Sequence, residues 1–107
     1  MTRLSELALD PRGYLQDREA WAPWVAEAMA AEDEITLTAA HWEILDFLRD
    51  YYDEFEMAPP MRVLVKAVAV RLGQEKAESR YLYRLFPDGP AKQACRYAGL
   101  PRPVSCI

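Results

Sequence analysis

Apolar side chains recur at the three- and four-residue spacing of an amphipathic helix in four stretches of the chain. These stretches predict helices over residues 18–31, 38–55, 61–72 and 76–86. The stretch 38–55 is the longest, with Trp42, Leu45 and Leu48 on one face and acidic residues on the other. We therefore expect this helix to supply the central packing of the domain.

Capping and helix-breaking residues predict where these helices begin and end. Asp17 and Thr38 can cap the first two helices by accepting hydrogen bonds from free backbone amides. Pro59-Pro60 separates the second helix from the third, and Gly73 can end the third. His41 is the only histidine and falls in a first helical turn, so we expect a structural or exposed residue rather than a metal ligand or general base.

A tight turn is predicted near the start of the chain. Asp10-Pro11-Arg12-Gly13 has favourable turn chemistry and lies between two short apolar pieces. We therefore expect a small β-hairpin over residues 7–15, which gives a mainly α chain with a minor β part.

The last part of the chain holds both cysteines. Pro90 suits the first turn of a fifth helix, which carries Cys95 and which Gly99 can end. Two later prolines forbid another helix, so residues 99–107 are expected to form a flexible C-terminal arm with Cys106 near its tip.

Residues 60–86 predict two helices around a glycine-containing turn, with Arg80 and Arg84 on the second helix. This arrangement resembles a helix-turn-helix DNA reader, and an ordinary helical hairpin is the alternative. A net charge of -4 and the absence of a basic arm argue against DNA binding, because nonspecific affinity comes from phosphate neutralisation.

The composition fits one globular domain over residues 1–107, since 51% of the residues are hydrophobic and 28% are charged. The chain has neither the apolar core of a signal peptide nor an apolar run of membrane-spanning length. We therefore expect a cytoplasmic protein without membrane insertion. In such a reducing compartment the two cysteines suit a transient or catalytic disulfide, and their spacing does not match a zinc site, so no metal or cofactor is expected.

Charge divides the chain into two halves. Residues 1–60 hold four basic and fourteen acidic side chains, whereas residues 61–107 hold nine basic and three acidic ones. Two interpretations remain open: oppositely charged faces that attract each other weakly, or a basic docking surface in the second half.

Local charge affects the reactivity of both thiols, because the thiolate is the nucleophile. Lys92, Arg96 and Arg102 can favour the thiolates. The negative end of the helix dipole opposes ionisation of Cys95, and the terminal carboxylate opposes ionisation of Cys106. The sequence therefore does not determine the pKa of either thiol.

Geometry limits how the two cysteines can meet. Cys95 and Cys106 are eleven residue steps apart, about 36–40 Å when extended, so the arm must fold back before a disulfide can form. The structural alternative is that Cys95 packs in the core as a small hydrophobic residue and that Cys106 is a terminal thiol without a function.

The cysteine-bearing region carries a family resemblance. The run 80–95, the run 98–103 and the penultimate Cys106 resemble the DsrC/TusE family of small sulfur carriers, which serve dissimilatory sulfur metabolism and tRNA thiolation. The resemblance extends through His41-Trp42 and the runs 47–52 and 58–64. One departure is Ser105, where DsrC members commonly have glycine.

The resemblance implies an α+β fold, mainly α, in which an orthogonal bundle of about five helices carries a short N-terminal β-hairpin and a helix-turn-helix-like arrangement. It implies that Cys106 takes a persulfide from an upstream sulfurtransferase and relays the sulfur to a partner. The partner would be dissimilatory sulfite reductase or a tRNA-thiolation enzyme, with a further contact to a membrane-bound reductase complex. Whether such a carrier counts as an enzyme is a matter of definition, since it undergoes half-reactions with partners and needs no cofactor.

Members linked to sulfite reductase also have the earlier cysteine, here Cys95, which allows a disulfide or trisulfide with Cys106. By that criterion the chain resembles DsrC more than TusE. A tRNA-thiolation relay and a helix-turn-helix DNA-binding regulator are the alternatives.

Overall fold

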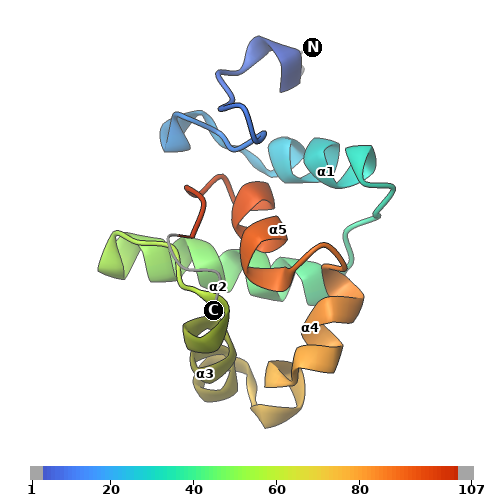
Figure 1. Ribbon diagram of the computed structural model, residues 1–107, viewed down its shortest axis with the longest axis vertical. Helices are drawn as coiled ribbons and strands as arrows, with labels where there is room; N and C mark the ends of the chain where they lie inside the picture. Colours follow the sequence, from blue (N-terminus) through green and yellow to red (C-terminus); the bar gives the residue numbers. More distant parts are fainter. Residues whose placement is uncertain (1–3, 104–107) are drawn as a thin grey trace.

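The computed structural model describes residues 4–103, and within this range the chain is helical with no β-sheet (Figure 1). The α-helices are α1 (Pro23–Glu32), α2 (Ala39–Phe55), α3 (Met61–Leu72), α4 (Ser79–Leu85) and α5 (Pro90–Tyr97). Three short 3-10 helices are η1 (Leu4–Glu6), η2 (Arg18–Ala20) and η3 (Gln74–Ala77). None of the helices among these residues is long and apolar enough to cross a bilayer.

Helix α5 lies in the middle of the domain and packs against α1, α2, α3 and α4 (Figure 1). Small buried side chains recur at helical spacing along it, at Ala91, Ala94, Cys95 and Ala98. Small residues allow the neighbouring helices to approach closely, so all four of them together fix the position of α5.

Helix α2 forms as its sequence predicts. Thr38 is the N-cap, and Ile44, Leu45 and Leu48 have no exposed surface. The Thr38 amide donates to His41 Nδ1 over 3.0 Å, and His41 Nε2 lies 2.9 Å from the Leu85 carbonyl oxygen. Since a carbonyl can only accept, Nε2 carries the proton, and the buried ring of His41 joins α2 to α4 as a structural group.

Local signals also place α3 and α5 correctly. Helix α3 follows Pro60 as N-cap and ends at Gly73, whose φ of 104° suits glycine. Helix α5 starts with Pro90 at its first position, where the missing amide costs no hydrogen bond.

Two predicted helices are each divided in the structure. The stretch 18–31 becomes η2, capped by Asp17, and then α1, because Pro23 starts a new helix and Trp21 is extended. The stretch 76–86 becomes η3 and α4, because Glu78 takes an extended conformation between them. Arg80 and Arg84 are exposed on α4.

The predicted N-terminal β-hairpin is not formed. The turn exists: the Asp10 carboxylate accepts from the Arg12 and Tyr14 amides, and Leu9 and Leu15 form one isolated antiparallel bridge. The chain enters η1 before this turn and η2 after it, so no ladder extends beyond the single bridge.

Candidate functional site

Cys95 lies in the core of the domain on α5 and has no exposed surface. Burial raises the pKa of its thiol to about 12, because a thiolate would lose its hydration there. Cys95 is therefore protonated near neutral pH and is a poor nucleophile in this conformation.

The cationic neighbours expected to favour the thiolate have other positions. Lys92 is exposed, and Arg96 forms an ion pair of 2.5 Å with Asp33. Lys92 and Arg96 do line one pocket together with Arg12, and Asp33 and Asp88 line it as well. Burial, and not a neighbouring charge, is what shifts the pKa of the Cys95 thiol.

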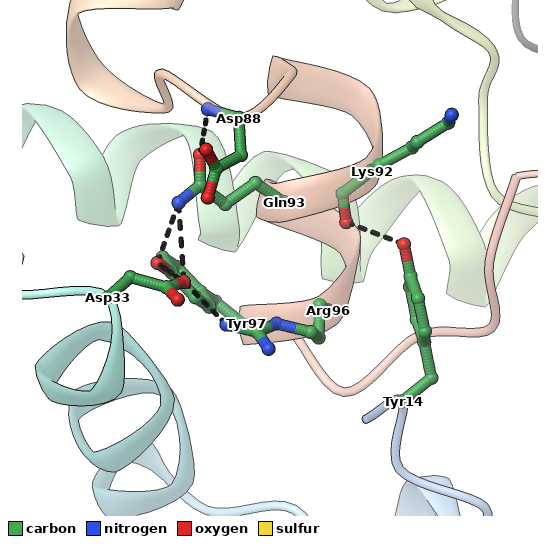
Figure 2. A network of polar contacts seen from close by, with 7 residues as sticks. All are labelled: Tyr14, Asp33, Asp88, Lys92, Gln93, Arg96 and Tyr97. Atoms are coloured by element: carbon green, nitrogen blue, oxygen red, sulfur yellow. Dashed lines mark hydrogen bonds and ion pairs between the residues drawn. The ribbon is translucent and has the colours of Figure 1, made fainter. Parts of the chain in front are cut away.

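Tyr14 is the ionisable group that the structure adds beside Cys95. Its hydroxyl donates to the Lys92 carbonyl oxygen over 3.1 Å, which joins the N-terminal turn to α5 (Figure 2). Burial raises the pKa of Tyr14 to about 12, and the nearby Cys95 adds to the shift. Two neutral groups with raised pKa values thus lie together at this position.

A polar network ties α5 to the end of α1 (Figure 2). Asp33 comes directly after α1, and its carboxylate accepts hydrogen bonds from Arg96 and from the Tyr97 hydroxyl, each over 2.5 Å. Gln93 donates to the Tyr97 hydroxyl over 2.9 Å and accepts from the Asp88 amide over 2.9 Å. Burial, together with the Asp33 contact, raises the pKa of Tyr97, so its hydroxyl stays a donor.

The C-terminal end of α5 is closed by a Schellman motif. The Leu100 amide donates to the Cys95 carbonyl over 3.0 Å, and the Gly99 amide donates to the Arg96 carbonyl over 3.2 Å. Gly99 has a φ of 75°, which glycine adopts without strain.

The described part of the predicted arm, residues 99–103, is packed against the domain at some positions, while Pro101 is exposed. Gly99, Leu100 and Pro103 are all buried, because the apolar Leu100 completes the core beside α5. Arg102 is partly exposed. Cys106 lies outside the described residues, so its position and its distance from Cys95 remain predictions.

Trp21 and Arg49 are site residues that the sequence did not indicate. The Trp21 indole donates to the Tyr97 carbonyl over 2.8 Å, and Arg49 donates to the Ala98 carbonyl over 2.6 Å. Pro23 offered one local signal, since a proline at the first helical position places Trp21 outside α1. Nothing local indicates which carbonyl either side chain reaches.

The fold and site define a small helical domain built around a central helix with a buried cysteine and a fixed C-terminal end. The family model described as "DsrC like protein" matches residues 2–107. The chain belongs to the DsrC family.

Some of the similar proteins are named sulfurtransferase TusE. Sulfurtransferase TusE of Photorhabdus laumondii is 53% identical over 102 residues, which cover 95% of this chain and 92% of that protein. The TusE of Salmonella typhimurium is also 53% identical, with 95% and 94% covered.

Solved structures of similar proteins have the same fold as this chain. The NMR structure of Allochromatium vinosum DsrC is 55% identical with a TM-score of 0.86, covering 94% of this chain and 90% of that chain. The crystal structure of the oxidized gamma-subunit of the dissimilatory sulfite reductase (DsrC) from Archaeoglobus fulgidus is 46% identical with a TM-score of 0.81, covering 94% and 92%.

Proposed function

We propose that this chain is a sulfur carrier whose Cys106 accepts sulfur as a persulfide and relays it to a partner enzyme. The observation that carries the proposal is the state of the other cysteine. Cys95 is buried with a pKa raised to about 12, which leaves Cys106 as the thiol for nucleophilic chemistry. Family membership and the sulfurtransferase relatives support this assignment.

The loading step is an exchange between a thiol and a persulfide. The Cys106 thiolate attacks the outer sulfur of a donor persulfide on an upstream sulfurtransferase. The donor S–S bond breaks and the donor thiolate leaves with its electron pair. One S–S bond forms for each one broken, so loading needs no external oxidant. Arg102 is proposed to support the Cys106 thiolate by its positive charge.

Cys95 is proposed to act second, as the resolving thiol. Its thiolate would attack the inner sulfur of the Cys106 persulfide, which forms a Cys95–Cys106 disulfide and releases hydrosulfide. In a trisulfide the transferred sulfur is instead held between the two cysteines, and its formation releases two protons and passes two electrons to the partner reductase. Either product requires the buried Cys95 sulfur to become accessible to Cys106.

Two partner classes follow from different observations. The presence of Cys95 and the similarity to a subunit named for dissimilatory sulfite reductase support that reductase as the partner. Relatives named TusE support a tRNA-thiolation enzyme as the second candidate. Carrier loaded with ³⁵S on Cys106 should pass label to sulfite reductase in the first case and to tRNA, through the thiolating enzyme, in the second.

Intact-mass measurement after incubation with a persulfide donor tests the carrier function. We expect the mass to rise by one sulfur atom in the unmodified chain and in Cys95→Ser. Cys106→Ser should gain nothing, and a Cys106→Ser protein that retains the added sulfur would refute the assignment. Arg102→Gln should load more slowly, whereas the control Arg80→Gln, on exposed α4, should load at the normal rate.

A further inference from the structure

Two consecutive carbonyls at the end of α5 are held by side chains from distant parts of the chain. Trp21 Nε1–H donates to Tyr97 O over 2.8 Å, from 76 residues away in sequence. Arg49 on α2 donates to Ala98 O over 2.6 Å, from 49 residues away. These carbonyls belong to the helix end, where backbone oxygens lack helical partners.

The two side chains also hold each other. The Arg49 guanidinium lies 3.8 Å from the centre of the Trp21 ring, which is a close cation–π contact. Burial lowers the pKa of Arg49, because the guanidinium gives up hydration at this position, and Arg18 nearby adds to the effect. The cation thus loses hydration while it holds a neutral carbonyl.

The Trp21 ring also packs directly on the backbone at Gly99. A Cβ atom at this position would lie 2.5 Å from Trp21 Cδ1, closer than real Cβ contacts, so only glycine fits. With Leu100 buried beyond it, the chain is fixed at three successive residues after α5: Ala98, Gly99 and Leu100. Helix capping by the Schellman motif needs none of these side-chain contacts.

We propose that Trp21 and Arg49 form an anchor that fixes the direction in which the chain leaves α5 and thereby positions Cys106 for sulfur transfer. The proposal rests on the carrier function of Cys106 proposed above. Six residue steps separate Leu100 from Cys106, at most about 20 Å when extended, so the direction set at Leu100 limits where Cys106 can lie. Transfer between protein-bound sulfurs is sensitive to displacements of a few ångströms. Trp21 and Arg49 are positioning residues, since they contact α5 and not the reacting sulfur.

A distance measurement tests the anchor directly. Nitroxide labels on Cys106 and on an introduced Arg84→Cys, in a Cys95→Ala background, report the position of the arm relative to α4. We expect Trp21→Phe, which keeps an aromatic ring and removes the donor, and Arg49→Met to shift or broaden the distance distribution by about 5 Å or more. Arg49→Lys, which can still donate to Ala98 O, should restore part of the original distribution.

Arg71→Met is the matched control. Arg71 also lies over an aromatic ring, 5.5 Å from the centre of Phe47, and pairs with the exposed Asp50, but it is on α3. The distance distribution of the Arg71→Met protein should stay unchanged. Circular dichroism should show that all variants are folded. Unchanged distributions in folded Trp21→Phe and Arg49→Met would overturn the anchor.

Transfer kinetics separate the anchor from the carrier function. A low-molecular-weight persulfide needs no docking and should load both anchor variants within twofold of the normal rate. A protein-bound persulfide should load them about tenfold more slowly. Equal slowing with both donors would contradict a positioning role. If the unmodified chain takes sulfur from neither donor, the carrier function fails, while the distance measurement still decides the anchor.

Discussion

At the scale of single residues, Cys95 combines complete burial with a reactive group type. A thiol in the core packs as a small hydrophobe, and the neighbouring Ala91, Ala94 and Ala98 show that this face of α5 requires small side chains. Packing therefore keeps the Cys95 thiol buried and neutral, whereas reaction with Cys106 requires an accessible thiolate.

The raised pKa of Cys95 predicts a pH-dependent loss of stability. An ordinary thiol has a pKa of about 9, and the folded-state pKa of Cys95 is about 12. Between these values the unfolded chain loses a proton that the folded chain retains, so the free energy of unfolding falls as pH rises. The contribution is fully present below about pH 9.

Denaturant unfolding at pH 8 and pH 10 measures this effect. We expect the unmodified chain to lose about 1 kcal/mol more than Cys95→Ala over this interval. Burial also raises the pKa of Tyr14 to about 12 from 10.0, which adds a loss above pH 10 in both proteins, smaller in Cys95→Ala because Cys95 contributes to that shift. Parallel pH profiles for the two proteins would show that Cys95 ionises normally in the folded state.

At the scale of elements, the sequence predicted what is decided locally. Helix ends at Thr38, Gly73 and Pro90 depend on caps and backbone preferences within a few residues, and the structure confirms them. The hairpin failed for a related reason. Turn chemistry at Asp10 is local and was correct, but a ladder depends on where the segments on both sides of the turn lead, and these segments lead into 3-10 helices at Leu4–Glu6 and Arg18–Ala20.

Contacts between distant elements could not be predicted this way. Asp33 and Arg96 are 63 residues apart, and no local pattern distinguishes Asp33 from its acidic neighbours. Trp21 lies within the predicted helix 18–31, yet in the structure its indole donates to the Tyr97 carbonyl at the end of α5. The sequence therefore identified α5 and its cysteine, and the structure identified the residues that hold α5 in place.

The Asp33 network makes a prediction about the attachment of α5 to α1. The side chains of Arg96 and Asp33 are only 19% and 24% exposed. Asp33→Ala leaves the Arg96 cation and the buried Tyr97 hydroxyl without their acceptor, so we expect a loss of about 2–4 kcal/mol in the free energy of unfolding. Urea denaturation measures this loss.

Asp50→Ala provides the comparison. Asp50 pairs with Arg71 over 3.2 Å, and both side chains are more than half exposed. Exposed pairs contribute little, so this variant should lose less than about 1 kcal/mol. Equal losses in the two variants would mean that the Asp33 network contributes no more than a surface pair.

At the scale of the whole molecule, the charge asymmetry is partly used inside the fold. Among the described residues, three ion pairs join a cation of the second half to a carboxylate of the first: Arg71–Asp50, Lys76–Glu43 and Arg96–Asp33. This supports the interpretation of two halves that attract each other. Other cations of the second half, such as Arg62, Lys66 and Lys92, stay exposed, so a basic docking surface remains a prediction.

The central position of α5 makes a prediction about access to Cys95. Because α5 packs against the four other α-helices and the Cys95 thiol has no exposed surface, we expect the thiol to become exposed only when much of the bundle opens. We expect alkylation at pH 8 to modify Cys106 quickly and Cys95 slowly. The rate at Cys95 should rise with urea, with a slope close to that of global unfolding, because the reactive state is the largely unfolded one.

Mass spectrometry of the modified chain at increasing urea follows both sites, and Cys106→Ser isolates the slow one. A slope much smaller than the global value would mean that the end of α5 opens locally, so Cys95 could meet Cys106 without help. With the expected slope, the isolated protein forms the Cys95–Cys106 disulfide only slowly. Rapid disulfide formation would then depend on a partner that opens the bundle around α5, so the partner would control when Cys95 reacts.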